Sequence, residues 1–460
     1  MRVTLVLTGS IYTELLGATS KPLEAAAVLL VRPVHTGRGS IRLLARELRW
    51  VPKEAYLVRK HDALTISSDG YVPSLQLAEE TEAMPMWLHT HPGEGSEPEP
   101  SPHDDQVDEQ LSPLFRLRSG SDWYGSLVIS NADGALIFTG HLEDDDSRHD
   151  VDRIWVVGPR LRLLHNWSHD LSDPDELFDR NVRAFGGGVQ RALGDLTAAV
   201  VGCGGTGSAV AEQLARLGVR RFLLIDPDQL SESNLTRVYG SFPKAVGDNK
   251  SAVLQRHIHR IAPDAHVHAI PSTVTEETTA RALTQADVVF GCTDDNAGRL
   301  VLSRLATYFL TPVIDSGVLI SSDTDELIES IYGRVTLLYP GAACLVCRNR
   351  IDLKRAAAET MTPEEHGRLA AEGYAPALGA VEPAVIAFTT QVAATAVGEL
   401  IERLVHYGLQ PPPSEVLLRI HDREISTNDE LPKERHYCHP SAGKLGLGFT
   451  EPFLEQTWRG

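Results

Sequence analysis

Two groups of residues on this chain have the types and spacing of catalytic sites, and the first is a histidine pair. His89 and His91 stand in WLHTHP, and Asp104 follows a proline-rich stretch. In a β-strand, residues two positions apart project from the same face, so both imidazoles point the same way. Two imidazoles and one carboxylate leave the fourth position of tetrahedral zinc open to water. The spacing therefore predicts a zinc-dependent hydrolase.

Such a site needs a base as well as a metal. Zinc lowers the pKa of its water, but a side chain must still accept the proton and pass it to the leaving amine. We assign this role to Glu24, which begins the apolar strand EAAAVLLV. Ser101 is the candidate donor to the developing oxyanion, and Asp105 is an alternative to Asp104 as ligand. Three other glutamates precede the histidines but fall in an expected helix: Glu79, Glu80 and Glu82.

The second group is a glycine-rich loop, VVGCGGTGS, that follows the strand TAAVV and opens the helix SAVAEQLARLG. Its glycines let the backbone approach a phosphate and direct N–H groups at it from the helix N-terminus. They are Gly202, Gly204, Gly205 and Gly207. Asp226 ends the next strand, 24 residues beyond Gly202, at the usual distance for a ribose-hydroxyl contact. Taken alone, these features fit NAD or FAD as well as ATP.

Residues further along the chain favour ATP. Asn234, Arg237 and Lys250 add polar and positive groups suited to a triphosphate, and we include Asp228 in the same nucleotide site. Asp294 follows the strand ADVVFGCT, where a carboxylate can hold Mg²⁺ against the phosphates. A hydride-transfer enzyme has no need of a magnesium carboxylate there, so the set favours nucleotidyl transfer.

The elements that position these residues fall into two parts. Residues 1 to about 145 mix short alternating strands with polar turns, and EDDDSRHDVD (Glu143–Asp152) is a charged junction. From about residue 180, apolar β-branched runs alternate with helical stretches, which is typical of a doubly wound parallel sheet. We therefore expect an α/β protein with domains at 1–145 and 179–427, a linker at 146–178, and a C-terminal tail at 428–460.

Composition limits the function classes. At 460 residues the chain is too long for one core, and its formal charge of −19 disfavours nucleic acid and anionic lipid as partners. The most compact apolar run, Ala25–Val31, is far shorter than a membrane span. Five cysteines do not make a disulfide framework. We expect a cytoplasmic protein without a membrane or nucleic-acid partner.

The first part resembles the JAMM metalloprotease family, whose pattern is an early Glu, then H-x-H-P, then S-x-x-D. Glu24, His89, His91, Ser101 and Asp104 match this pattern, although the spacer from His91 to Ser101 is longer than usual by two residues. The resemblance implies a cytidine-deaminase-like α/β fold, a catalytic Zn²⁺ and cleavage of peptide or isopeptide bonds.

The second part, about residues 175–425, resembles the ThiF/MoeB/ubiquitin-activating superfamily in GCGGTGS, IDPDQLSESNLTR, VGDNK and CTDDNAGR. The resemblance implies ATP- and Mg²⁺-dependent adenylation of the C-terminal Gly of a ubiquitin-like protein. It also implies the residue roles. Asp226 would bind ribose and Asp294 would hold Mg²⁺, while Arg180 matches an arginine that reaches into the partner subunit of a homodimer. The phosphates would be bound by Asn234, Arg237 and Lys250. Val238 stands where a Gln usually follows the Arg.

The cysteines suggest a second zinc. Cys344 and Cys347 form C-x-x-C, and Cys438 lies between His436 and His439. The superfamily often holds a structural zinc at such a pair, and a Cys₃His set is chemically reasonable. A redox-active or merely packed C-x-x-C is the alternative. The other two cysteines, Cys203 and Cys292, are expected to be small buried residues.

The leading hypothesis is a two-activity enzyme of a ubiquitin-like or sulfur-carrier pathway. One domain would trim the tag protein, and the other would adenylate its exposed C-terminal Gly. No cysteine occurs from Arg348 to Tyr437, so we expect the acyl group to pass to a downstream conjugating or sulfur-donor protein without a thioester on this chain. A non-catalytic scaffold that binds a ubiquitin-like protein is the alternative, and a nicotinamide-dependent oxidoreductase is disfavoured.

Overall fold

The computed structural model describes residues 1–37, 39–61, 63–95, 97–169, 171–322, 327–371 and 383–458. The chain forms two compact units. The first contains Met1–Ser172 and Leu445–Phe449, and the second contains Asp173–Lys444 and Thr450–Gly460. In the described part of the chain, no helix combines the length and the apolar character that a membrane span requires.

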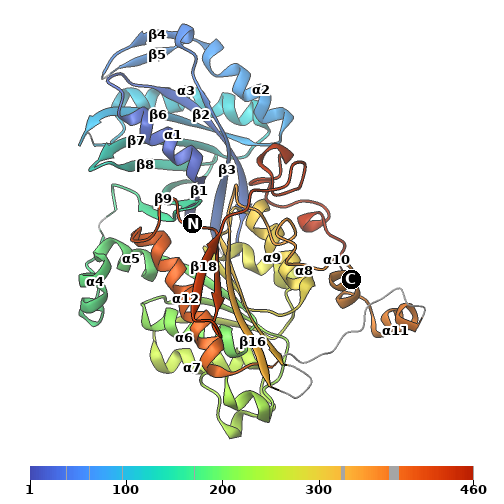
Figure 1. The fold of residues 1–460 in the computed structure, drawn as a ribbon. Helices are drawn as coiled ribbons and strands as arrows, with labels where there is room; N and C mark the ends of the chain where they lie inside the picture. Colours follow the sequence, from blue (N-terminus) through green and yellow to red (C-terminus); the bar gives the residue numbers. More distant parts are fainter. Residues whose placement is uncertain are drawn as a thin grey trace. The chain divides into compact units, whose positions relative to one another are not determined.

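The first unit is built on an 8-stranded sheet in the order β1-β3-β2-β6-β7-β8-β9-β10 (Figure 1). Its strands are β1 (Arg2–Thr8), β2 (Ala26–His35), β3 (Ser40–Trp50), β6 (Met84–Glu94), β7 (Tyr124–Ala132), β8 (Ala135–Glu143), β9 (Arg148–Val157) and β10 (Arg162–His165). A separate hairpin pairs β4 (Tyr56–Arg59) with β5 (Leu64–Ile66). The helices of this unit are α1 (Gly9–Thr19), α2 (Val72–Glu80) and α3 (Pro102–Ser119).

Strand β2 shows why a continuous apolar run forms here. Ala27, Leu29 and Val31 join one hydrophobic core, which includes residues of α1. The alternate residues Ala26, Val28 and Leu30 join a second core with side chains of α2 and α3. Successive side chains of a strand point to opposite faces, so a strand covered on both faces is apolar throughout.

The structure does not confirm a cytidine-deaminase-like arrangement for this unit, because its sheet closes into a strand barrel. β1 pairs in parallel with β9 as well as with β3. The backbone N–H of Val3 also donates to Asp152 Oδ2 at 2.6 Å. β9 and β10 lie within the segment that the sequence assigned to a linker. Strands β1 and β9 are far apart in the chain, and no local sequence pattern shows that they pair. The closing of the sheet into a barrel could therefore not be predicted.

The second unit carries another 8-stranded sheet, in the order β13-β12-β11-β14-β15-β16-β17-β18. The strands from β13 to β15 pair in parallel, and those from β15 to β18 pair antiparallel. The strands are β11 (Thr197–Val201), β12 (Arg221–Ile225), β13 (His266–Ile270), β14 (Val288–Gly291), β15 (Val313–Ser322), β16 (Ile328–Leu338), β17 (Glu415–Arg419) and β18 (Glu424–Asn428). The Rossmann-type doubly wound core expected from the strand–helix alternation is confirmed.

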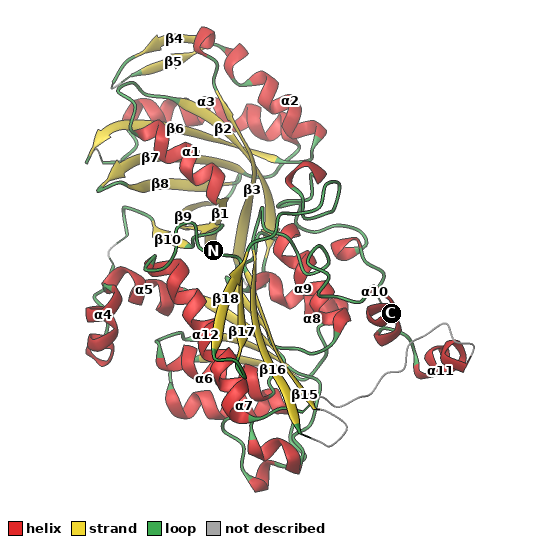
Figure 2. Ribbon diagram, viewed as in Figure 1, coloured by secondary structure: helices red, strands yellow, loops and turns green. Residues whose placement is uncertain are grey.

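Helices cover both faces of this second sheet. Figure 2 shows α6, α7 and α12 on one side and α9 on the other. The helices of the unit are α4 (Asp179–Phe185), α5 (Gly187–Asp195), α6 (Gly205–Arg216), α7 (Lys250–Ile261), α8 (Glu277–Ala282), α9 (Asn296–Tyr308), α10 (Leu353–Glu359), α11 (Pro363–Ala371) and α12 (Ile386–Val405). This layering places the ends of β11, β12 and β14 side by side, where the sequence predicts the nucleotide site.

Candidate functional site

The glycine-rich loop connects β11 to α6 through a turn that excludes side chains. Gly202 has a φ of +90°, and a Cβ there would lie 2.6 Å from the carbonyl oxygen of Cys292. A Cβ on Gly207 would lie 1.8 Å from the carbonyl oxygen of Gly202. Gly204 is the N-cap residue of α6 and Gly205 is its first residue. The loop is thus packed tightly between β11, α6 and the end of β14, and its backbone can approach a ligand closely.

Asp226 is joined directly to this loop. It lies just beyond β12 and is 5% exposed. Its Oδ2 accepts a hydrogen bond of 2.6 Å from the backbone N–H of Cys203, and its Oδ1 accepts one of 2.9 Å from Asp228. Burial raises the pKa of Asp226, and the charge of Lys250 opposes that shift. Lys250 in turn pairs with Asp228, with Nζ 2.7 Å from Oδ2. The structure therefore brings the predicted ribose and phosphate residues together.

Asn234 and Arg237 belong to the segment that follows β12, and Arg237 packs against the loop. Asn234 is 7% exposed and caps a short 3₁₀ helix by accepting from the Ser231 backbone N–H at 3.2 Å. Arg237 donates to the carbonyl oxygen of Ser233 at 3.0 Å. Its Cδ lies 3.4 Å from the position that a Cβ on Gly205 would take. The Arg237 side chain is therefore packed against the glycine loop.

The neighbouring aspartates after β14 have different roles. Asp295 is the N-cap residue of α9, and its carboxylate accepts from the backbone N–H of Gly298 and from the Thr293 hydroxyl. Burial raises the pKa of Asp295. Asp294 is exposed, and its carboxylate is not used by that cap. The geometry thus distinguishes the candidate magnesium ligand from the structural aspartate beside it.

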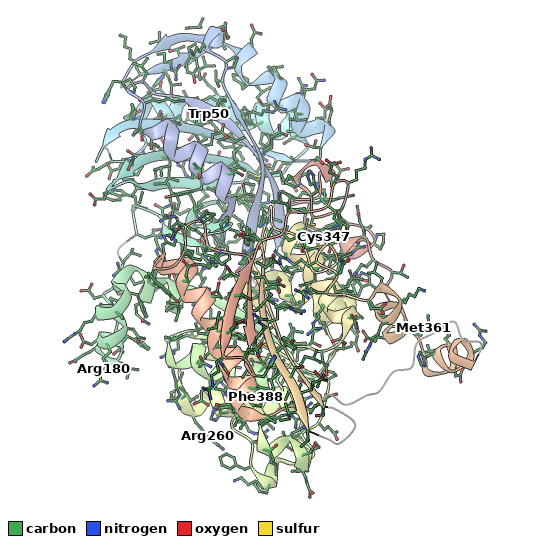
Figure 3. The ribbon with its side chains drawn as sticks, viewed as in Figure 1. Trp50, Arg180, Arg260, Cys347, Met361 and Phe388 are labelled. Atoms are coloured by element: carbon green, nitrogen blue, oxygen red, sulfur yellow. The ribbon has the colours of Figure 1, made fainter. Side chains whose placement is uncertain are left out.

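Arg180 lies apart from these residues. It is exposed on α4, and Figure 3 shows it at the outer end of that helix. Among the residues that the structure describes, no hydrogen bond or ion pair links Arg180 to the phosphate loop. A role at the nucleotide site of the same chain is therefore unsupported by its contacts, and a role in a partner subunit stays a prediction.

The cysteine cluster gathers residues from distant parts of the second unit. Ligand atoms of Cys344, Cys347, His436 and Cys438 all lie within 4.8 Å of one another. His436 Nδ1 lies 3.2 Å from the sulfur of Cys438 and 3.6 Å from that of Cys344. A hydrogen bond from Cys438 lowers the pKa of Cys344, which favours a thiolate. Thiolates and imidazole are the ligands that zinc prefers, so the set fits this metal.

The structure also separates the candidate histidines of that cluster. His439 Nδ1 accepts a backbone hydrogen bond of 3.2 Å from Ser441 and lies 2.7 Å from its hydroxyl, so it caps the 3₁₀ helix Pro440–Ala442. His436 faces the sulfurs instead (the position of Cys347 is labelled in Figure 3). The sequence left the fourth ligand open, and the geometry favours His436.

In the first unit, His89 and His91 on β6 meet Asp104 in the first turn of α3. His89 Nε2 lies 3.2 Å from Asp104 Oδ1, and His91 Nε2 lies 3.8 Å from Oδ2. Ser101 and Asp104 form a capping box that fixes the start of the helix. Asp104 Oδ2 accepts from the Ser101 backbone at 2.7 Å, and Ser101 Oγ accepts from the Asp104 backbone at 3.3 Å. The Ser101 hydroxyl keeps its own hydrogen for donation.

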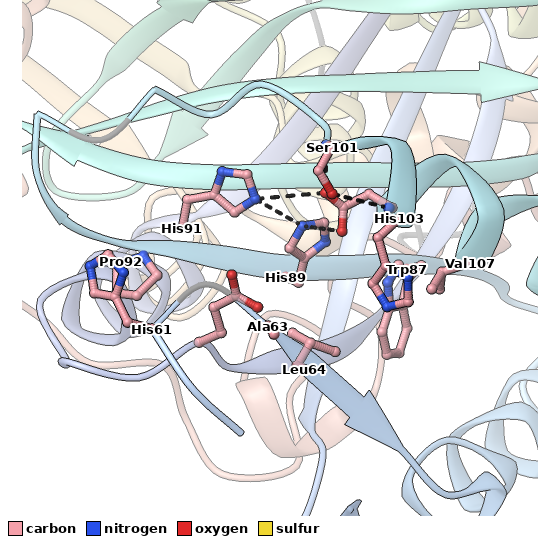
Figure 4. A pocket seen from close by; sticks show the side chains of 12 residues that line it. His61, Ala63, Leu64, Trp87, His89, His91, Pro92, Ser101, His103 and Val107 are labelled. Atoms are coloured by element: carbon pink, nitrogen blue, oxygen red, sulfur yellow. Dashed lines mark hydrogen bonds and ion pairs between the residues drawn. The ribbon is translucent and has the colours of Figure 1, made fainter. Parts of the chain in front are cut away.

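The electrostatics of this cluster fit a cation. The Nε2 atoms of His89 and His91 are 3.3 Å apart, and both lie near the Asp104 carboxylate (Figure 4), so three atoms that can bind a metal face one another. His91 Nδ1 donates to the carbonyl oxygen of Glu97 at 3.1 Å, which leaves Nε2 as its lone-pair nitrogen. Burial acts to raise the pKa of Asp104, but hydrogen bonds with both histidines lower it well below its usual range. Burial acts to lower the pKa of His91, yet Asp104 and Glu97 raise it.

A cavity of about 300 Å³ opens beside these residues. Glu24 lines it and is 7% exposed, and its carbonyl oxygen accepts from Arg59 at 2.7 Å. The lining also includes His61, Ala63, Leu64, Trp87, His89, His91, Pro92, Ser101, His103, Asp104 and Val107 (Figure 4). None of the alternative acids, Glu79, Glu80, Glu82 and Asp105, is among the described lining residues.

Several residues that line this cavity were not predicted from the sequence. Trp87 stands two positions before His89 on β6, so strand alternation could have placed it on the same face. His61 follows β4 in the hairpin, and its distance from the histidine pair in the chain gave no signal. His103 is in the first turn of α3, next to Asp104, and its position there follows from the capping box.

The chain is similar in sequence to a known protein family and to several of its members. The ThiF family model matches residues 178–439. tRNA threonylcarbamoyladenosine dehydratase of Bacillus subtilis is 40% identical over 101 residues, which are 22% of this chain and 40% of that protein. Sulfur carrier protein ThiS adenylyltransferase of Escherichia coli is 33% identical over 125 residues, 27% of this chain and 50% of that protein. This chain thus spans half or less of the length of either relative.

A third relative is matched over more of its length. Molybdopterin-synthase adenylyltransferase of Escherichia coli is 29% identical over 187 residues, which are 40% of this chain and 71% of that protein. Among solved structures, Escherichia coli MccB with ATP is similar at 18% identity and a TM-score of 0.44, covering 56% of this chain and 73% of that chain.

Proposed function

The chain belongs to the ThiF family, and we propose that its second unit uses ATP and Mg²⁺ to adenylate the C-terminal glycine of a ubiquitin-like or sulfur-carrier protein. The observation that carries this proposal is the hydrogen bond from the backbone N–H of Cys203, in the glycine-rich loop, to the carboxylate of Asp226. The names of two relatives support the substrate class, since both are adenylyltransferases, one of a sulfur carrier protein and one of molybdopterin synthase.

In the proposed reaction, a carboxylate oxygen of the terminal glycine attacks the α-phosphorus of ATP. A new acyl–phosphate bond forms, the α–β phosphoanhydride bond breaks, and pyrophosphate leaves with the electron pair. The backbone N–H groups of the loop from Gly202 to Gly207 stabilise the phosphates, together with Arg237 and Lys250. Asp294 would hold Mg²⁺, which would supply positive charge against the triphosphate.

ATP binding and pyrophosphate exchange test this proposal. We expect calorimetry to detect ATP with Mg²⁺, and a carrier protein that ends in Gly-Gly to support ATP–pyrophosphate exchange. Asp294→Ala should abolish exchange, because the metal loses its carboxylate. Asp264→Ala is the matched control, since Asp264 is an exposed aspartate of the same unit that pairs with Arg220. Full exchange in Asp294→Ala, or no ATP binding in the unaltered protein, would refute the proposal.

For the first unit we propose a zinc-dependent peptidase of JAMM type. Three observations support it: the cluster of His89, His91 and Asp104, the adjoining cavity, and the presence of Glu24 in the cavity wall. When bound by these ligands, zinc supplies Lewis acidity and a water of lowered pKa. Glu24 would accept a proton from the attacking water and donate it to the leaving amine, and the Ser101 hydroxyl would donate to the substrate carbonyl oxygen.

The two proposed activities act on the same chain end. Cleavage after the glycine of a ubiquitin-like precursor or conjugate gives the free carboxylate that adenylation needs. Loss of cleavage on chelation, and in His89→Ala, tests the peptidase. His169→Ala is the control, because His169 is a partly exposed histidine of the same unit that pairs with Asp150. Cleavage that persists in zinc-free His89→Ala would exclude a metallopeptidase.

A further inference from the structure

The N-terminus of α9 is held by a residue of another helix. The first N–H groups of a helix have no partner within it, and side chains close by in the sequence usually accept from them. Asp295 does so for the N–H of Gly298. The N–H of Ala297, however, donates at 2.9 Å to Oε2 of Glu359, which lies 62 positions further along the chain. The start of α9 therefore depends on a distant segment as well as on its own sequence.

Further hydrogen bonds join the same two helices through Asn296, the first residue of α9. Its Nδ2 donates to Oε1 of Glu359, the last residue of α10, at 3.3 Å. Its Oδ1 accepts a hydrogen bond of 2.9 Å from the backbone N–H of Asp352, the N-cap residue of α10. Asn296 thus contacts both ends of α10, which packs against α9 (both helices are labelled in Figure 2).

The carboxylate of Glu359 is shielded from water, and both of its oxygens accept hydrogen bonds. Its side chain is 13% exposed. Arg355, one turn earlier on α10, donates from Nε to Oε1 of Glu359 at 3.1 Å. A negative charge is favourable at a helix N-terminus, because the N–H groups there carry partial positive charge. Glu359 is therefore suited to hold the start of α9, and its oxygens are engaged in doing so.

Asp294, the candidate magnesium ligand, comes just before this helix start. It is exposed, while the residues on either side of it are tied together, because the Thr293 hydroxyl donates to the Asp295 carboxylate. The next two residues of the turn are those that Glu359 holds. Mg²⁺ demands near-ideal octahedral geometry, so a carboxylate that binds it must be held at a defined place. The contacts of Glu359 supply such a restraint on the backbone that carries Asp294.

We propose that Glu359 is a positioning residue for the nucleotide site, which fixes the start of α9 and thereby presents Asp294 to Mg²⁺. This inference rests on the proposed adenylation function. Glu359 acts through Asn296 and Ala297 and does not itself bind the metal or the nucleotide. The inference also gives α10 a role, because this helix follows the C-x-x-C segment in the chain and connects it to the nucleotide site.

ATP binding measured by calorimetry tests this role without a carrier protein and without turnover. The dissociation constant of ATP is measured in EDTA and in saturating Mg²⁺, and the ratio of the two constants reports how strongly Mg²⁺ supports binding. We expect Glu359→Ala to lower this ratio by about 10-fold, as when a residue that supports a metal ligand is lost. Its ATP affinity in EDTA should stay close to that of the unaltered protein, because the phosphate-binding residues are untouched. Glu364→Ala, which removes an exposed glutamate of α11, should leave the ratio unchanged.

A double variant shows whether Glu359 acts through Asp294. Asp294→Ala should lower the ratio most, because the metal loses its carboxylate. Adding Glu359→Ala to Asp294→Ala should lower the ratio no further, since residues that act through one metal ligand are not additive. Asn296→Ala loses one of the two hydrogen bonds to Glu359 and should give a smaller fall. This milder change keeps the inference testable if Glu359→Ala does not fold.

The possible outcomes separate the inference from the proposed function. If Asp294→Ala lowers the ratio while Glu359→Ala and Asn296→Ala lower only the melting temperature, Glu359 is a structural cap and the inference alone is overturned. A further fall in the double variant would also overturn it, because Glu359 would then act independently of Asp294. If Asp294→Ala leaves the ratio unchanged, the proposed magnesium ligand and the inference both fail.

Discussion

The sulfur atoms of Cys347 and Cys438 lie 3.6 Å apart although the residues are separated by 91 positions in the chain. This distance is far longer than a disulfide bond, and all five cysteines of the protein are free. Cys344 and His436 complete the set. A shared metal ion explains why these buried sulfur atoms lie close together without forming a disulfide bond.

We therefore predict that the chain binds a structural zinc at this cluster. His436→Ala should lose one zinc ion per chain and lower the melting temperature, because metal binding adds directly to folding free energy. His439→Ala should keep the metal, since that ring caps a 3₁₀ helix instead. Elemental analysis and thermal unfolding check both variants. An unchanged zinc content in His436→Ala would contradict a zinc site with this ligand set.

A second prediction concerns the base of the proposed peptidase. Glu24→Gln preserves the shape of the side chain but cannot accept a proton. Cleavage should fall by about 10²- to 10⁴-fold, while the zinc content stays the same. Glu82→Gln is the control, because Glu82 is exposed and pairs with Arg32. Cleavage assays and metal analysis on the same samples check this prediction. Full cleavage activity in Glu24→Gln would show that another group is the base.

The sequence predicted the parts of both sites that depend on local spacing. His89 and His91 share a strand face, as residues two positions apart on β6 do. The glycines from Gly202 to Gly207 likewise follow from a tight turn between a strand and a helix. Each of these depends on neighbours within a few residues, where periodicity and turn chemistry are informative.

Features that depend on distant segments could not be predicted. The pairing of β1 with β9 closes the first sheet, yet neither strand carries a pattern that specifies its partner. The choice of His436 over His439 depends on how the C-terminal segment returns to the C-x-x-C.

A third prediction tests the expectation that Arg180 acts in a partner subunit. Arg180→Ala and Lys250→Ala should each lose pyrophosphate exchange as pure proteins. A mixture that exchanges subunits should recover about a quarter of full activity, since half of the dimers then contain one intact site. Sedimentation should show a dimer. A monomer at micromolar concentration, or no recovery on mixing, would contradict the role in trans.

The fourth prediction is a pH dependence of stability from His141. Its pKa is lowered to about 3 in the folded protein, by burial first and by Arg148 second, whereas an unfolded histidine titrates near 6.5. Between these values the unfolded chain binds the extra proton, so stability falls as the pH drops below about 6.5, by up to about 1.4 kcal/mol per pH unit. Stability that depends on neutral His141 is therefore present at neutral pH and lost in acid.

Urea unfolding of the first unit at pH 7 and pH 5 checks this effect. His141→Gln should be less stable than the unaltered protein at pH 7, and it should lose less stability between pH 7 and pH 5. His169→Gln, a change at a more exposed histidine, should keep the original pH dependence. An identical slope in His141→Gln and the unaltered protein would show that another group dominates.

The last prediction concerns the fate of the acyl group after adenylation. A thioester intermediate needs an accessible thiolate that can attack the adenylate. Burial raises the pKa of Cys203 well above its usual range, and that of Cys292 to about 12. Both thiols are therefore protonated at neutral pH and make poor nucleophiles. The remaining cysteines, Cys344, Cys347 and Cys438, belong to the candidate zinc cluster.

We therefore expect an acyl-adenylate that passes directly to a sulfur donor or to a cysteine on another protein. Incubation with ATP, Mg²⁺ and a carrier protein ending in Gly-Gly should produce pyrophosphate but no thiol-sensitive adduct on a non-reducing gel. Cys292→Ser should then leave pyrophosphate exchange unchanged, because its thiol takes no part in the chemistry. An adduct that disappears in Cys292→Ser would make this cysteine the nucleophile and would contradict the prediction.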